Sequence, residues 1–173
     1  DHSASNIAYY GQDLTGDYNT GVANSGNLTS APITIQPAGT TTLLFNYRLQ
    51  TEGQISPFDQ ATVLVSTDGF ATSTVLATKS SGAIAESLVW RSMALNLSAF
   101  AGQTIQIRFS FDTLDAIANG FLGWQIDDVS VSQLRLGDAN LDDVQGTITI
   151  DGGAGQDLVY FQDLQTAAAV GDT

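Results

Sequence analysis

The chain has 173 residues, of which 43% are hydrophobic, and its 18 Asp and Glu residues against five Lys and Arg give a net charge of −13 at pH 7. This charge would repel phosphate backbones and anionic lipid surfaces, which excludes nucleic acid as a partner, and no apolar run approaches the ~18 residues that cross a bilayer. The chain contains no Cys, so disulfides and thiolate metal sites are excluded, while metals with oxygen ligands stay open.

Alternation of apolar and polar residues with a period of two dominates residues 31–132 and predicts β-strands. The pattern is clearest in TTLLFNYRLQ, QATVLVS and QTIQIRFSFD. Packing the apolar faces of such strands against each other predicts an all-β fold, a two-sheet antiparallel β-sandwich. The residues expected to face its core are Leu43, Phe45, Tyr47, Leu49, Ala61, Val63, Val65, Ile105, Ile107, Phe109 and Phe111.

Two local signals interrupt the strands. The dipeptide Asp68-Gly69 lies between QATVLVS and TSTVLAT and predicts the turn of a hairpin. In FLGWQIDDVSVSQ, Trp124 and Ile126 share one parity, whereas Val129 and Val131 share the other and are expected to point inward. A strand that keeps its apolar residues inward absorbs such a slip with a β-bulge, here expected at Asp127-Asp128. The alternative is that both carboxylates leave the strand into solvent.

The composition changes after Gln133, because residues 137–173 contain seven Asp and no Lys or Arg. We therefore predict two parts, a sandwich over 1–134 and an acidic, Gly-rich β appendage over 135–173. Within the appendage, TITIDGGAGQDLVYF suggests two short strands around a Gly-rich turn. The appendage is interpreted as the start of a following repeat region.

Five segments in order, GNLTSAPITI, TTLLFNYRLQTEG, FDQATVLVSTDGF, LNLSAFAGQTIQIRFSFDT and GWQIDDVSV, resemble a known series of motifs. The series is similar to the jelly-roll modules that accompany immune-inhibitor-A-type metallopeptidases in bacterial secreted proteins, and more distantly to MAM adhesion domains. The resemblance covers about residues 6–132. It implies a two-sheet jelly roll, often calcium-bound, that is attached to hydrolases or adhesins and performs no chemistry itself. The usual Gly-Gly-x-x-Trp after the turn is replaced by GFATS.

The resemblance also implies a Ca²⁺ site. By position, Glu52, Asp59, Asp127 and Asp128 match acidic residues of the family pattern and are expected to form a calcium cluster, with Asp115 and Asn119 as further candidates. Calcium takes six to eight oxygen ligands, so several strands and loops would have to contribute. For each acid the alternative is an ordinary solvated side chain.

A second calcium motif lies in the appendage. Residues 152–160, GGAGQDLVY, fit the nonapeptide of repeats-in-toxin β-rolls, with Asp157 as the ligand. The motif occurs once, and a β-roll needs about three repeats. A Gly-rich hairpin turn supported by Asp157 therefore stays the alternative.

Catalysis is not expected. His2 is the only histidine and Cys is absent, so neither a Ser-His-Asp triad, a Cys-His dyad nor a histidine-held zinc site can be assembled without that terminal residue. A pair of carboxylates acting on glycosides stays open, because their separation is not visible in a sequence.

Two functions from different classes fit these features. The first is a carbohydrate- or surface-binding accessory module of a larger secreted protein, for which Trp90, Tyr9, Tyr10 and Tyr18 are candidate stacking platforms. Trp90 is more readily a core residue, and Trp124 is expected inside. The second is a structural or adhesion module of a surface filament or layer, with calcium-dependent self-association. A domain that assists a neighbouring protease fits the same features. All place the chain outside the cell, beside other domains of the same polypeptide.

Overall fold

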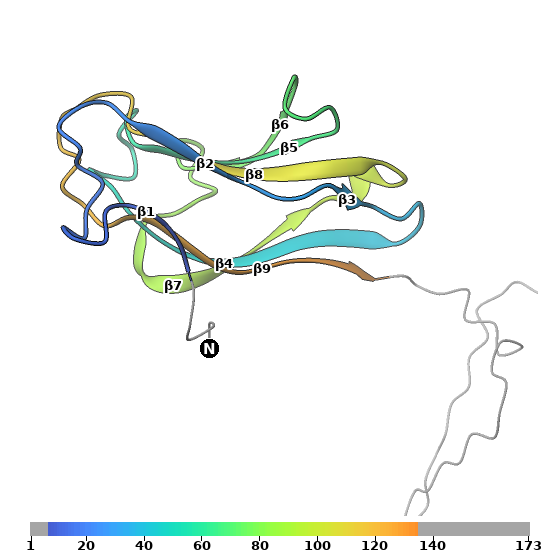
Figure 1. Cartoon of the computed structure of the whole chain (residues 1–173). Coiled ribbons are helices and arrows are strands. Elements are labelled where there is room, and N and C mark those ends of the chain that lie inside the picture. The colour runs from blue at the N-terminus through green and yellow to red at the C-terminus, as the bar shows by residue number, and fades with distance from the viewer. Residues whose placement is uncertain (1–6, 135–173) are drawn as a thin grey trace, which may run out of the picture. The chain divides into compact units, whose positions relative to one another are not determined.

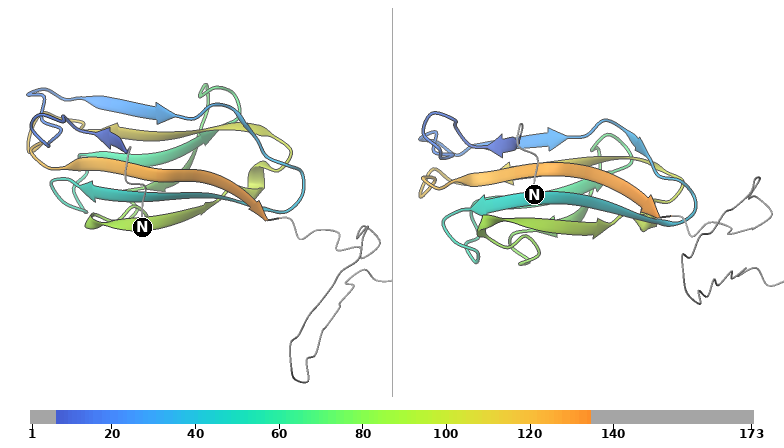
Figure 2. Two further views of the ribbon diagram at one scale, coloured as in Figure 1. Left: turned by 60° about the horizontal axis from the view of Figure 1, so that its bottom comes forward. Right: turned by 90° about the horizontal axis from the view of Figure 1, so that it is seen from below.

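The computed structural model describes residues 7–134, which form two antiparallel sheets that face each other (Figures 1 and 2). The first sheet has the order β1-β9-β4-β7, with β1 (Ala8–Tyr10), β9 (Gly123–Leu134), β4 (Thr40–Gln50) and β7 (Ser87–Asn96). The second has the order β2-β8-β5-β6, with β2 (Ser25–Thr29), β8 (Thr104–Asp112), β5 (Gln60–Ser66) and β6 (Thr74–Thr78). A further strand, β3 (Ile33–Thr34), also pairs with β8, and a 3₁₀ turn spans Ser98–Phe100.

This strand order confirms the predicted sandwich and gives it the topology of a jelly roll. When β2 and β3 are counted as one interrupted strand, each consecutive strand crosses to the other sheet except at the β5–β6 hairpin. Within residues 7–134, no helix has the length and apolar character needed to span a bilayer.

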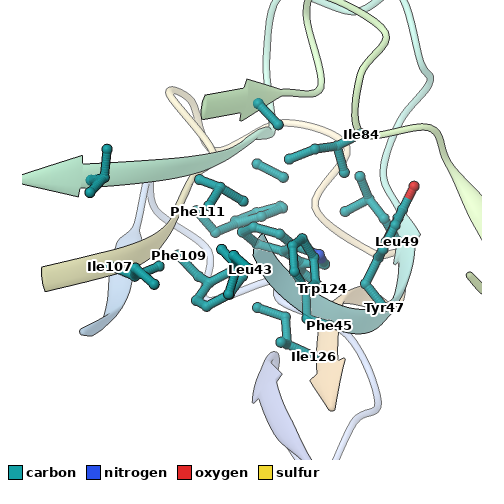
Figure 3. Packing of buried hydrophobic residues seen from close by; sticks show 14 of the residues in the cluster. Leu43, Phe45, Tyr47, Leu49, Ile84, Ile107, Phe109, Phe111, Trp124 and Ile126 are labelled. Atoms are coloured by element: carbon teal, nitrogen blue, oxygen red, sulfur yellow. The ribbon is translucent and has the colours of Figure 1, made fainter. Parts of the chain in front are cut away.

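The core lies between the sheets and includes the predicted alternating residues (Figure 3). It also contains residues that the alternation did not assign to it, among them Tyr18, Ile35, Ala77, Ile84 and Leu97. All eleven side chains that the alternation assigned to the core in β4, β5 and β8 are buried. The ring of Phe109 meets Phe45 edge-on at a centroid distance of 5.0 Å and Trp124 at 5.8 Å. Each such aromatic pair contributes about 0.5–1.5 kcal/mol beyond burial itself. The predicted interior position of Trp124 is confirmed.

The slip in β9 is a bulge, as predicted. Leu44 pairs with Ser130 while Asn46 pairs with Asp127, so Asp128 and Val129 both stand opposite a single residue of β4. Asp128 adopts φ 51°, in the left-handed region. The expectation that Val129 points inward is wrong, because it falls inside the bulge and is 47% exposed; Val131, beyond the bulge, packs against the core.

The hairpin predicted at Asp68-Gly69 joins β5 to β6, which pair antiparallel. The Asp68 carboxylate accepts hydrogen bonds from the Thr72 hydroxyl at 2.6 Å, the Thr72 backbone N–H at 2.9 Å and the Ser66 hydroxyl at 2.7 Å. Phe70, in the segment where the resembling modules carry a different sequence, lies under the Arg108 guanidinium at 3.6 Å from the ring centroid. A loop of seven residues is thereby fixed at both ends.

The chain divides into two units at Leu134 and Arg135, at the end of β9. The second unit, 135–173, lies outside the described residues. The predictions made there, the β appendage and the Asp157 nonapeptide, therefore stay predictions, as does any role for His2.

Candidate functional site: buried oxygens at one end of the sandwich

Three loops meet at the end of the sandwich where β4 and β8 finish (Figure 1). They are residues 11–24, 51–59 and 113–122. The Asp59 backbone N–H donates to the Thr113 carbonyl at 3.2 Å, and the Thr113 N–H donates to the Asn24 carbonyl at 3.0 Å. These two bonds hold the loops together.

Asp59 is the most deeply buried acid of this end, with no exposed surface. Its Oδ2 accepts hydrogen bonds from the Tyr18 hydroxyl at 2.6 Å and from the Glu52 backbone N–H at 3.4 Å. Its Oδ1 is buried and has no hydrogen-bond partner among the described residues. Burial raises the pKa of the Asp59 carboxyl, while the bond from Tyr18 pulls that pKa back down. An unpaired buried carboxylate oxygen is costly unless a donor or cation meets it.

Asn119 supplies a second oxygen of this kind. Its side-chain nitrogen donates to the Asp115 carbonyl at 3.1 Å, whereas its buried Oδ1 has no partner in the described part of the chain. The Thr113 hydroxyl lies 2.8 Å from the same Asp115 carbonyl. Thr113 therefore connects Asn119 to Asp59, so the structure brings both oxygens without a hydrogen bond, Asp59 Oδ1 and Asn119 Oδ1, to one end of the sandwich.

Glu52 and Asp115 lie beside these residues and have local partners. One Glu52 carboxylate oxygen accepts a hydrogen bond from the Ser56 hydroxyl. The Asp115 carboxylate accepts one from the Ile117 backbone N–H at 2.9 Å. Carboxylate, amide and backbone carbonyl oxygens are the ligands that Ca²⁺ prefers. Oxygen atoms of all three kinds therefore lie at this end of the sandwich.

Asp127 and Asp128 lie elsewhere, in β9 beside Asn46, where Asp127 pairs with Asn46 and is buried while Asp128 stands in the bulge and is exposed. Asp128 accepts a hydrogen bond from the Asn46 amide at 2.9 Å, and Asp127 accepts one from the Asp128 backbone N–H at 2.8 Å. Asn46 precedes Glu52 by six residues, about 20 Å of extended strand. Within residues 7–134 no three acidic or histidine side chains gather closely enough to hold a metal. The predicted cluster of four carboxylates is thus not formed, because this pair lies beside Asn46 in the middle of the sheet and not at the end where Glu52 and Asp59 lie.

Sequence reasoning missed Lys79, the only lysine of the chain. Its side chain is fully buried, and its Nζ donates to the Phe58 carbonyl at 2.9 Å and approaches the Ser56 carbonyl at 3.5 Å. Burial lowers the pKa of this ammonium, opposed first by the charge of Glu86 and then by that of Asp59. The available signal was parity, since Lys79 follows the inward-facing Ala77 by two residues.

The candidate stacking residues separate into two places. Tyr9, Tyr10 and Tyr18 line one cavity of about 300 Å³ beside the 11–24 loop. Tyr18 is 1% exposed and belongs to the core cluster, so the expectation that its ring is a stacking platform is wrong. Trp90 lies in β7, outside the core cluster, with the Arg48 guanidinium 5.2 Å from its ring centroid. The preference for Trp90 as a core residue is therefore wrong, because the register of β7 places its ring beside Arg48.

Comparison with known proteins found no matching family model. Bacillopeptidase F of Bacillus subtilis (strain 168) is 33% identical over 140 residues, which cover 78% of this chain but 9% of that protein. Among solved structures, the K1 cleaved adhesin domain of Lys-gingipain from Porphyromonas gingivalis W83 is 13% identical with a TM-score of 0.42, and the match covers 65% of each chain. The sequence match thus corresponds to a small part of a much longer protein.

Proposed function

We propose that this chain is a non-catalytic accessory module of a larger secreted or cell-surface protein, and that a calcium ion joins the loops at one end of its sandwich. The observation that carries the calcium proposal is the pair of buried oxygens without partners, Asp59 Oδ1 and Asn119 Oδ1. Other buried polar atoms of the described residues, such as Thr41 Oγ1 and Trp124 Nε1, also lack a hydrogen bond. Asp59 Oδ1 and Asn119 Oδ1 differ in that both are oxygens of the kind that binds calcium and both lie where the three loops meet.

The chain's own residues would hold the ion. Asp59 and Asn119 would each contribute the Oδ1 atom as a ligand. Glu52 would turn its carboxylate from Ser56 towards the ion. Backbone carbonyls of the three loops would complete the six to eight oxygens that calcium takes. The bond from Tyr18 to the other Asp59 oxygen leaves Oδ1 available for this role.

The accessory role is supported by the sequence match and by the residues present. The matched relative is far longer than this chain, which fits a module among other domains. Residues 7–134 contain neither His nor Cys, the groups most often used as bases and nucleophiles. As partners we propose neighbouring domains of the same polypeptide and a polysaccharide or another cell-surface component.

Calorimetric titration of the 173-residue chain with calcium tests this function. We expect binding that Asp59→Asn weakens at least tenfold, because the substitution removes a charged ligand. Asp128→Asn is the matched control, since Asp128 lies in the bulge, and it should bind as the parent does. Equal loss in both variants, or no binding by the parent, would overturn the proposed site.

A structural role in self-association is the second candidate, favoured by the edge of the first sheet. Leu88 and Val89 in the edge strand β7 are 60% and 71% exposed. Exposed apolar edge strands are templates for pairing with another chain. Sedimentation velocity with and without calcium decides between the two: concentration-dependent assembly that Val89→Lys abolishes supports this candidate, and a monomer at all concentrations rejects it.

A further inference from the structure

The cavity beside the 11–24 loop has the lining of a ligand site. It is open to solvent on one side and is lined by the three tyrosines Tyr9, Tyr10 and Tyr18 together with polar side chains that include Gln12, Asn24 and Ser25. We call it the tyrosine cavity. Its volume of about 300 Å³ is at the small end of the range for ligand sites, which suits a single ring.

Hydrogen bonds fix the walls of the tyrosine cavity. The Asn24 amide donates to the Tyr18 carbonyl at 3.3 Å, to the Thr20 hydroxyl at 2.9 Å and to the Val22 carbonyl at 3.1 Å. Its Oδ1 accepts a hydrogen bond from the Tyr10 hydroxyl. A wall held in this way loses little conformational freedom when a ligand binds.

One wall carries an unused polar group. The Tyr9 hydroxyl is buried and has no hydrogen-bond partner among the described residues. Tyr9 lies against Gly11, which also lines the cavity: a Cβ at Gly11 would stand 2.1 Å from Tyr9 Cζ and 2.3 Å from Tyr9 Oη. Glycine is therefore required at position 11 for the Tyr9 ring to take this place.

The charge around the tyrosine cavity selects against anions. No Lys or Arg occurs before Arg48, and the carboxylates of Asp17 and Asp13 lie close enough to Tyr9 to raise the pKa of its hydroxyl further. An anionic ligand would meet only like charge here. Hydroxyl and amide groups beside aromatic rings instead suit a neutral ring that carries several hydroxyls.

We propose that the tyrosine cavity binds one residue of a neutral saccharide. The Tyr9 ring would turn to bring its buried hydroxyl to the sugar, where the hydroxyl would gain a partner. The cavity's amide and hydroxyl groups would bond to the remaining sugar hydroxyls. This inference rests on the proposed accessory role, and it assigns that role a binding site and a ligand class.

Amide NMR spectra of the 173-residue chain, titrated with neutral sugars in saturating calcium, test the inference. The probes are glucose, galactose, mannose, xylose and N-acetylglucosamine with their short oligomers, and glucuronate serves as the acidic comparator. We expect at least one neutral sugar to shift the amides of Gly11, Thr20 and Ser25 while those of β7 stay in place, and glucuronate to shift none of them.

Two variants sharpen the result. Tyr9→Phe should weaken sugar binding about fivefold, the usual worth of one hydrogen bond. It should leave the melting temperature unchanged, because the Tyr9 hydroxyl has no hydrogen-bond partner among residues 7–134. Gly11→Ala should weaken binding further by displacing the Tyr9 ring. Trp90→Ala, in β7, is the control and should bind as the parent does.

The outcomes separate the two proposals. Absence of shifts at about 10 mM sugar, or binding lost in Trp90→Ala and kept in Tyr9→Phe, overturns the tyrosine cavity as a sugar site. Calcium binding in the same sample is measured separately. If calcium fails to bind and the sugar shifts persist, the cation site is wrong and the tyrosine cavity stands.

Discussion

The Tyr18 hydroxyl donates to Asp59 Oδ2 at 2.6 Å, although the two residues are 41 positions apart. This bond connects the loop that walls the tyrosine cavity to the loop that carries the proposed calcium ligands. Burial and the neighbouring Asp59 carboxylate together raise the pKa of Tyr18 far above its ordinary value, so the hydroxyl stays a donor at any pH at which the chain folds.

Tyr18→Phe removes this donor and leaves the buried Asp59 carboxylate with only the long backbone bond from Glu52. We expect the free energy of unfolding to fall by about 1–3 kcal/mol, the cost of an unsatisfied buried polar group. Urea unfolding in calcium-free buffer measures it. Tyr9→Phe is the matched control, because the Tyr9 hydroxyl has no described partner. If both variants lost the same free energy of unfolding, the hydrogen bond from Tyr18 to Asp59 would not contribute to stability.

Asp59 gives a stability difference that depends on pH. Burial raises its pKa in the folded chain above the unfolded value of 3.8. Between these two pKa values the folded chain binds more protons than the unfolded chain, so this group's contribution to stability falls as pH rises through the window. In calcium-depleted buffer, the free energy of unfolding of Asp59→Asn should therefore rise relative to that of the parent as pH increases above about 4. Urea titrations across this range would refute the account if the difference between the two chains stayed constant.

Asp68 acts in the opposite direction. Hydrogen bonds from Thr72, and then from Ser66, lower its pKa to about 2. Its contribution to stability is therefore complete above the unfolded pKa and is lost as pH falls towards 2. Asp68→Ala should destabilise the chain at pH 6, and the gap to the parent should close below about pH 4. A gap that persists at pH 2 would show that the carboxylate's charge is irrelevant to the hairpin.

Gly123 begins β9 under two constraints. Its φ is +80°, and a Cβ there would lie 2.2 Å from the Tyr10 carbonyl oxygen, a backbone atom that cannot move aside cheaply. We expect Gly123→Ala to cost more than about 2 kcal/mol. Gly120→Ala is the control, because a Cβ at Gly120 meets nothing within 4 Å. Similar melting temperatures for the two variants would contradict the packing of β1 against β9.

Sequence patterns predicted those parts of the structure that local chemistry determines. The alternation in β4 and β8 gave the core faces, and the parity slip at Asp127-Asp128 gave the bulge, because both depend only on which side of one strand a residue occupies. The motif pattern also predicted that Asp127 and Asp128 lie close to Glu52. This prediction is wrong, because neither segment contains information about the distance between residues on different strands and loops.

The site itself was only partly predictable for the same reason. Asp59 and Asn119 were named from a resemblance, but nothing local shows that Tyr18 reaches Asp59 or that Lys79 reaches the Phe58 carbonyl. These contacts depend on how the loops of both sheets meet at one end. Lys79 was missed, although its parity with Ala77 and its being the only lysine of the chain were two signals that could have marked it.

Thermal melting with and without calcium tests the central claim most directly. At a calcium concentration of about 100 times the dissociation constant, binding to the folded chain alone adds about 2.7 kcal/mol of stability. For a chain of this size that predicts a melting temperature about 5–10 °C higher than in chelator, and no such rise for Asp59→Asn. Identical melting curves for the parent chain in calcium and in chelator would contradict the account.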